Sequence, residues 1–150
     1  VRKDQYNRLW ITSRGDHKDV QPQLVCLQPL HPTPYTLHHI SPSEMVIFGD
    51  SMYFYGSHWS DETMSNQITY GVFNIQNPTS DNRPLITDGT EQNIKIPYGI
   101  QVNPHNGDIY ITDAKNYVSS GQLHCYSREG KRKWSVRTGD IPAHMCFVYR

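Results

Sequence analysis

The sequence predicts an all-β fold built from short antiparallel strands. The first observation is local: runs of about four to eight residues alternate in polarity or carry β-branched and aromatic side chains, and Gly, Pro, Asn or Asp bounds each run. The second is that apolar residues nowhere recur with the period of an amphipathic helix. The third is composition, since ten glycines, ten prolines and ten tyrosines among 150 residues are typical of strands joined by turns and not of a disordered chain.

Charge and cysteine content narrow the class of protein. Fourteen basic and fourteen acidic residues give a net charge of zero, so neither nucleic acid nor an anionic membrane is predicted as a main partner. No apolar run in the sequence reaches membrane-spanning length, so no transmembrane segment is predicted. Cys26, Cys125 and Cys146 are an odd number at no metal-binding spacing, and we expect them to be buried as small hydrophobic side chains.

The first part of the chain is predicted to contain three strands. They span 9–13, 24–27 and 35–40. A charged loop at 14–21 and a proline-rich turn at 29–34 separate them. His38 and His39 point to opposite sides of an outer strand, and we expect both on the surface. Residues 1–7 are polar and carry no structural signal.

The middle of the chain is predicted to contain four more strands. They span 44–48, 52–55, 68–75 and 84–87. Gly49 and Asp50 are expected to form a tight turn between the first two. The segment 56–67 is polar and predicts a long loop inserted between the second and third strands.

A four-stranded meander is predicted between 97 and 139. Asn106-Gly107 is a strong hairpin signal, because a type I′ turn needs a positive φ at both of its central residues. Glu129-Gly130 is a second, weaker turn signal. After this stretch the chain begins a further strand, expected at 142–148.

The strands form a repeat. Trp10, Tyr53 and Tyr110 occupy the same position in three apolar–aromatic–apolar strands, and we expect all three in the core. Each inner strand begins at a proline; these prolines are Pro42, Pro97 and Pro142. They are 55 and 45 residues apart, and a four-stranded unit of roughly 40–50 residues is the size of a β-propeller blade. The sequence therefore predicts a β-propeller fragment of about two and a half four-stranded blades.

We expect residues 1–150 to form one partial propeller. The strands of a blade are labelled A to D from the central axis outward. The predicted parts are strands B to D of one blade at 8–40, a blade at 42–88, a blade at 97–139 and a closing inner strand at 142–148. In this scheme the first blade lacks its inner strand and the last strand lacks partners. Because open sheet edges favour pairing with another chain, we expect this sequence to be the C-terminal piece of a longer protein.

The motifs resemble those of known propellers. The stretch 97–131, with Pro-Tyr-Gly-Ile-Gln-Val-Asn-Pro followed by Gly-Asp-Ile-Tyr-Ile-Thr-Asp, is similar to the NHL and YVTN repeats. Together with Tyr-Asn-Arg-Leu-Trp-Ile-Thr at 6–12 and Gly-Asp-Ile-Pro-Ala at 139–143, it resembles the C-terminal blades of the YncE-like "putative surface layer" propellers of Bacteroidota. This resemblance covers roughly residues 6–148.

The resemblance implies an exported protein. It implies a parent propeller of seven blades, located at the cell surface as an outer-membrane lipoprotein or in the periplasm. One branch of the family, the BtuG-like lipoproteins, captures cobalamin outside the cell and passes it to a TonB-dependent transporter. A corrinoid ligand and such a transporter as partner are therefore hypotheses for this chain.

Blade topology predicts the face that would bind a ligand. The connections from strand B to strand C lie on the same face as those from D to the next A, and here they are the long ones, at 14–21, 56–67 and 113–120. Long loops on a rigid scaffold carry function more often than tight turns do. The candidate ligand-binding residues on or near this face are Glu44, His58, Trp59, Tyr98, Asp113, Lys115, Tyr117 and His144, with Asp61 and Asn116 beside them. Aromatic and polar groups around a concavity suit a large planar or sugar-like ligand.

Several of these candidates have a structural alternative. Asp113 ends a strand, where a carboxylate often orders the following turn through an Asx hydrogen bond. Glu44 and Tyr98 follow the prolines that open blades and could satisfy backbone groups there. His58 and His144 have no metal-ligand spacing, so no metal is predicted. Trp59, within a polar segment, is harder to explain as core.

The preferred function is non-catalytic ligand binding. No nucleophile elbow, metal triad or phosphate-binding loop is present in the sequence. One alternative is a propeller that docks protein partners. Another is a calcium-dependent lactonase-like hydrolase, although the predicted axial residues Glu44, Tyr98 and His144 include only one carboxylate, a poor ligand set for Ca²⁺.

Overall fold

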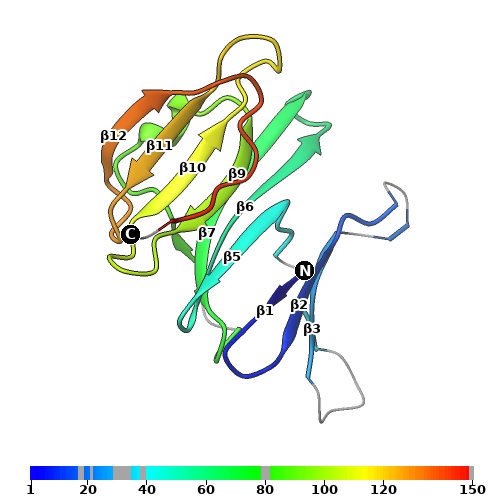
Figure 1. The fold of residues 1–150 in the computed structure, drawn as a ribbon. Coiled ribbons are helices and arrows are strands. Elements are labelled where there is room, and N and C mark those ends of the chain that lie inside the picture. The colour runs from blue at the N-terminus through cyan, green and yellow to red at the C-terminus, as the bar shows by residue number, and fades with distance from the viewer. Residues whose placement is uncertain (17–18, 21, 29–34, 38–39, 79–81, 149–150) are drawn as a thin grey trace. The chain divides into compact units, whose positions relative to one another are not determined.

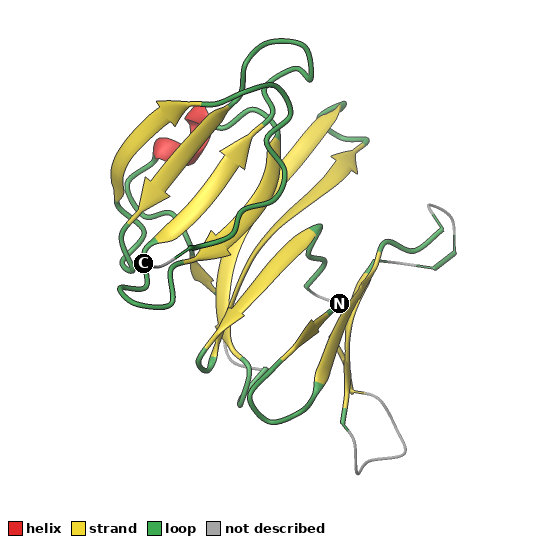
Figure 2. Cartoon of the chain, viewed as in Figure 1, coloured by secondary structure: helices red, strands yellow, loops and turns green. Residues whose placement is uncertain are grey.

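The fold is all-β, as the sequence predicts. The computed structural model describes residues 1–16, 19–20, 22–28, 35–37, 40–78 and 82–148 (Figure 1). The described residues form three antiparallel sheets and one short 3₁₀ helix (Figure 2). The chain divides into two compact units, which are residues 1–81 (the first unit) and 82–150 (the second unit). Within the described residues, no helix has the length and apolar character needed to span a membrane.

The first sheet has four strands in chain order. They are β1 (Arg2–Lys3), β2 (Leu9–Ser13), β3 (Gln23–Leu27) and β4 (Tyr35–Leu37). This sheet has one strand more than predicted, since β1 pairs with β2 through Arg2 opposite Trp10. A strand of two charged residues offers no polarity alternation, which is why the sequence pattern does not reveal it. The predicted surface positions His38 and His39 lie outside the described residues.

The second sheet contains a longer hairpin than predicted. Its strands β5 (Glu44–Phe48), β6 (Ser51–Ser60) and β7 (Ser65–Asn74) are antiparallel neighbours. The tight turn at Gly49 and Asp50 is confirmed, with Gly49 at φ +57°. The predicted loop at 56–67 is wrong: β6 and β7 stay paired as far as Ser60 opposite Ser65. In the half of the hairpin nearest its turn, most side chains are exposed on both faces of the sheet. The sequence there shows no alternation of apolar and polar residues, which is why the pattern did not predict strands.

The core of the first unit lies between its two sheets. Trp10 from β2 packs edge-on against Phe73 from β7 with ring centroids 5.9 Å apart, and Phe73 packs in turn against Phe54 at 6.2 Å. The remaining members of this buried cluster are Leu24, Cys26, Ile40, Met45, Met52 and Ile75. Trp10 and Tyr53 are both buried, as predicted, although Tyr53 belongs to the opposite face of its sheet.

The second unit contains the predicted four-stranded meander. Its elements are β8 (Arg83–Pro84), the 3₁₀ helix η1 (Thr90–Asn93), β9 (Pro97–Val102), β10 (Ile109–Asp113), β11 (Gln122–Tyr126) and β12 (Arg132–Arg137). Strands β9 to β12 are neighbours in chain order, which confirms the meander. The strand predicted at 84–87 is reduced to β8.

The turn between β9 and β10 differs from the predicted type I′ turn. Asn103 and Asp108 close a four-residue loop, in which Gly107 donates its N–H to the Asn103 carbonyl at 2.8 Å. Gly107 has φ +73°, but Asn106 is not among the residues with positive φ. Pro104 fixes its own φ near the value of a type I turn, so the loop is built around that turn and only Gly107 is left-handed. The weaker signal at Gly130, with φ +82°, does mark the turn between β11 and β12.

The final segment forms no strand. The described residues 142–148 run across the sheet of the second unit (Figure 1). Phe147 packs edge-on against Tyr110 at 5.4 Å, and a Cβ on Gly99 would collide with the Ala143 carbonyl oxygen. Tyr110, predicted as core, is therefore only partly buried and is covered by this segment. Cys146 in the same segment is exposed, contrary to prediction, whereas the other two cysteines are buried.

Candidate functional site

An exposed pair of tyrosines marks the candidate site on the second unit. The rings of Tyr98 and Tyr117 meet edge-to-face, with centroids 5.6 Å apart and planes 78° apart. Tyr98 is 38% exposed and Tyr117 47% exposed. The structure thus brings together two predicted site residues that are 19 positions apart in the chain, and both offer ring surface to solvent.

A β-bulge sets the position of Tyr98. In the ladder between β9 and β10, Thr112 is opposite Gly99 and Asp113 is opposite Pro97, so Tyr98 has no directly opposite partner. An extra residue in one strand bends it and turns a side chain out of the regular alternation. The bulge therefore releases Tyr98 from the pleat and lets it meet Tyr117.

Asp113 connects the two segments that carry Tyr98 and Tyr117. It is fully buried, and its Oδ1 accepts hydrogen bonds from the backbone N–H groups of Ile96 and Lys115, both at 2.8 Å. Ala114 adds a backbone hydrogen bond to the Ile96 carbonyl at 2.9 Å. The bond to Lys115 is the predicted Asx turn. Asp113 thus ties the start of β9, which carries Tyr98, to the loop that carries Tyr117.

The loop 114–120 is held in an uncommon backbone conformation. Lys115 and Tyr117 have φ +53° and +63°, and a left-handed non-glycine residue costs about 1–2 kcal/mol. Tyr117 donates its N–H to the Ala114 carbonyl at 2.9 Å. The Asn116 side chain accepts from the N–H groups of Val118 at 3.1 Å and Ser119 at 2.8 Å. Asn116 therefore stabilises its own loop, and the loop presents Tyr117 in one defined place.

His144 lies in the segment that crosses this sheet. The neighbouring Ala143 carbonyl stands over Gly99, the residue that follows Tyr98. The His144 side chain is exposed. The structure therefore brings the backbone next to His144 to the same end of β9 as Tyr98.

Sequence reasoning missed a buried histidine in this unit. His124 on β11 is 1% exposed, and its Nδ1 lies 2.7 Å from the Ser135 Oγ. Burial lowers the pKa of His124, and the charge of Asp113 only partly opposes this effect. The ring is therefore neutral at neutral pH. His124, Cys125 and Tyr126 are buried in succession, so both faces of β11 are covered there and polarity alternation offered no signal that His124 lies inside.

The other predicted residues belong to the first unit. Glu44 on β5 forms an ion pair through Oε1 with the Arg2 Nη2 at 2.7 Å. His58 and Trp59 are exposed on the outer half of β6, opposite Gln67 and Asn66, with Trp59 56% exposed. Asp61 is exposed in the turn that follows. His58, Trp59 and Asp61 therefore belong to the outer end of the β6–β7 hairpin and not to a long loop.

Metal ligation has no support from the described residues: among them, no group of three or more His, Cys, Asp or Glu side chains could hold an ion. In comparisons with known proteins, the chain matches no protein-family model and no curated protein.

Proposed function

We propose that this chain is the ligand-binding part of an exported β-propeller and has no catalytic role of its own. The observation that carries the proposal is the exposed Tyr98–Tyr117 pair, which the backbone of its own sheet holds in place. The strand repeats of the sequence and the three four-stranded antiparallel sheets support the propeller assignment.

The pair suits a ligand with a broad, flat or ring-bearing surface. Tyrosine offers a large apolar face with a polar tip, and holding it costs little conformational entropy because only two side-chain torsions are fixed. The Asp113 hydrogen bonds and the left-handed Lys115 and Tyr117 are formed without a ligand. Little ordering cost then remains to be met on binding. Lys115 adds a cation at the edge of the site.

Cobalamin is the first ligand to test. The resemblance to surface-exposed propellers that pass a corrinoid to a TonB-dependent transporter suggests it, and the broad corrin ring matches the requirement for a flat surface. In this proposal Tyr98 and Tyr117 contact the ring, Lys115 and His144 contact its polar periphery, and Asp113 positions the loop from within.

The test is calorimetric titration of the chain with cyanocobalamin. We expect binding by the unaltered protein. Tyr98→Ala and Tyr117→Ala are each expected to lower the affinity about five- to thirtyfold, since each removes ring contacts worth about 1–2 kcal/mol. Val118→Ala is the matched control, because Val118 is exposed in the same loop but offers no ring. Absence of binding ends the corrinoid assignment. Binding that both tyrosine variants retain ends the assignment of this surface.

A further inference from the structure

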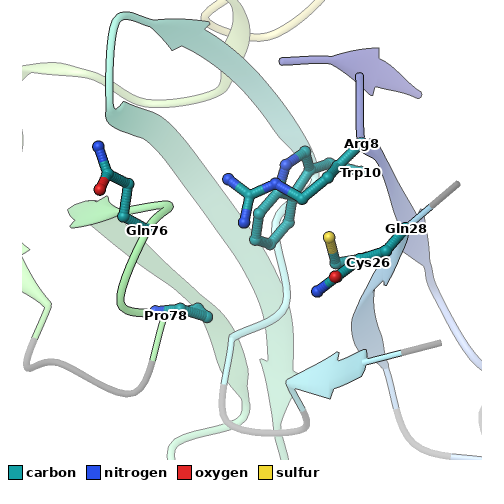
Figure 3. A pocket seen from close by; sticks show the side chains of 6 residues that line it. All are labelled: Arg8, Trp10, Cys26, Gln28, Gln76 and Pro78. Atoms are coloured by element: carbon teal, nitrogen blue, oxygen red, sulfur yellow. The ribbon is translucent and has the colours of Figure 1, made fainter. Parts of the chain in front are cut away.

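A pocket in the first unit offers a second site, remote in sequence from the tyrosine pair. It has a volume of about 230 Å³ and is lined by Arg8, Trp10, Cys26, Gln28, Gln76 and Pro78. Figure 3 shows the Arg8 guanidinium lying over the Trp10 ring, with Gln28 and Cys26 on one side and Gln76 and Pro78 on the other. Drug-sized ligands occupy roughly 300–1,000 Å³, so this pocket suits a small group or the end of a larger molecule.

The Arg8 side chain is held in place before any ligand arrives. Its Nε donates to the Asp4 Oδ2 at 2.7 Å, and its guanidinium carbon lies 5.0 Å from the Tyr6 ring centre and 5.4 Å from that of Trp10. The side chain is only 15% exposed. A guanidinium fixed on three sides has little freedom to lose on binding.

Part of the guanidinium lacks an acceptor. The Arg8 Nη2 is buried and has no hydrogen-bond partner in the part of the chain that the structure describes. Leaving a buried donor unsatisfied costs about 1–3 kcal/mol. An acceptor on a bound molecule would remove that cost after a small shift of the side chain.

The two glutamines add the complementary groups. Gln76 uses its amide nitrogen to donate to the Tyr6 hydroxyl and the Asp50 Oδ2, both at 2.6 Å, which leaves its carbonyl oxygen as an acceptor. Gln28 follows β3 and is half-buried at the pocket wall. Its amide provides both a donor and an acceptor. The groups that line the pocket are therefore complementary to a ligand that has one hydrogen-bond acceptor and one donor close together.

Charge decides between the ligand classes. The Asp4 carboxylate already neutralises Arg8, and the Asp50 carboxylate lies behind Gln76. A carboxylate ligand would bring a negative charge to a site whose one positive charge is already neutralised. An ammonium ligand would offer no hydrogen-bond acceptor to Arg8. We propose that this pocket binds a neutral carboxamide, with its oxygen toward Arg8 and its NH₂ group toward Gln28 and Gln76, and with its alkyl part against Trp10 and Pro78.

The test follows the Trp10 indole N–H and the Arg8 Nε–H by two-dimensional NMR during titration of the full chain. Propionamide is the probe. Propionate and 2-butanone have the same number of heavy atoms, but propionate carries a negative charge and 2-butanone has no NH₂ group. We expect saturable shifts with propionamide in the millimolar range. The other two compounds are expected to bind at least about fivefold more weakly, the effect of one hydrogen bond.

Variants separate the pocket from general surface binding. Gln28→Leu keeps the approximate size of the side chain but removes its acceptor, and it is expected to weaken propionamide binding about fivefold. Gln28→Glu keeps an acceptor for the ligand NH₂ group, and it is expected to retain binding. Gln92→Leu, at an exposed position in the second unit, is expected to bind like the unaltered protein. Unchanged signals outside the pocket show that each variant is folded. The proposal is overturned if propionamide gives no saturable shift, if propionate binds as well, or if Gln28→Leu binds normally.

Discussion

Asp4 shows how much a single buried carboxylate can organise. Its two oxygens accept hydrogen bonds from the backbone N–H groups of Tyr6 at 2.9 Å and Arg8 at 3.0 Å, from the Arg8 Nε at 2.7 Å and from the Trp10 Nε1 at 2.9 Å. Burial raises the pKa of Asp4, but these hydrogen bonds from Trp10, Arg8 and Tyr6 outweigh it and hold the pKa below its ordinary value of 3.8. The carboxylate thus fixes the turn between β1 and β2 and anchors Trp10 in the core.

Replacing Asp4 by Asn is expected to destabilise the first unit by about 3 kcal/mol. The change removes the charge that compensates Arg8, and breaking one side of a buried ion pair costs about 3–5 kcal/mol. We take the low end because the Arg8 side chain is 15% exposed. Urea unfolding followed by tryptophan fluorescence measures the change. Asp61→Asn, in an exposed turn, is the control and should stay within about 0.5 kcal/mol of the unaltered protein.

The same pair of proteins gives a pH dependence with a defined sign. Because the folded-state pKa of Asp4 is lowered, its contribution is complete above the unfolded-state value near 3.8 and is lost as pH falls through the folded-state pKa. The stability difference between the unaltered protein and Asp4→Asn should be constant from pH 7 to about 5 and should shrink below about pH 4. A difference that stays constant down to pH 3 would contradict this account of Asp4.

At the scale of elements, the two halves of the β6–β7 hairpin differ in how much of their side-chain surface is buried. The inner half carries buried side chains such as Met52, Phe54 and Phe73, while the outer half, beyond Gly56, exposes most of its side chains. Gly56 sits at the junction, where a Cβ would approach the Ser41 carbonyl oxygen to 2.7 Å. The backbone ladder is continuous through both halves, but only the inner half gains stability from burial.

Amide hydrogen exchange should separate these halves. Amides at 57–60 and 65–68 are expected to exchange at least about a hundredfold faster than those at 52–55 and 71–73, since opening the outer half exposes little apolar surface. Exchange detected by mass spectrometry on overlapping peptides gives the comparison. The strands β10 and β11, with buried residues along both, are the internal reference for slow exchange. Equal protection along the whole hairpin would show that the outer half is stabilised by contacts beyond its ladder.

At the scale of the whole molecule, one strand pattern recurs and the chain end departs from it. Successive antiparallel strands form each of the three sheets, and the sequence repeats follow them. The segment 142–148 carries the opening pattern of another repeat but crosses the second unit's sheet as an irregular chain. The Tyr110 ring contacts Trp134 at 5.8 Å and Phe147 at 5.4 Å, so this crossing gives Tyr110 a second aromatic neighbour.

Removing the Phe147 ring should lower the stability of the second unit by about 1–2 kcal/mol. The ring is partly buried and its edge-to-face contact with Tyr110 adds about 0.5–1.5 kcal/mol to the burial of its surface. Thermal or urea unfolding of Phe147→Ala measures the loss, and greater quenching of tyrosine fluorescence reports exposure of Tyr110. Val148→Ala is the control, because Val148 is mostly exposed. Equal stability of the two variants would mean that the segment does not protect the sheet.

Much of the candidate site could be predicted from the sequence only in outline. Long strand-connecting loops predict Lys115 and Tyr117, and the position after a blade-opening proline predicts Tyr98. The structure does bring the two tyrosines into contact. The bulge at Tyr98 could not be predicted, since it depends on which β9 residue pairs with Asp113. The hydrogen bond of Asp113 to Lys115 could be predicted from local turn chemistry. Its second hydrogen bond, to Ile96, could not, because Ile96 is distant in the sequence.

The sequence by itself determined the all-β class, the order of the strands and most of their positions, because alternation, β-branched residues and turn residues act within a few neighbours. Tertiary structure decided what depends on distant partners. It paired the charged residues of β1 with β2, extended the β6–β7 ladder through an exposed polar segment, and laid 142–148 across a sheet. In each case, backbone hydrogen bonding or packing with residues distant in the sequence outweighed the local pattern. Such contacts do not produce a periodic pattern of residue types, so the sequence does not reveal them.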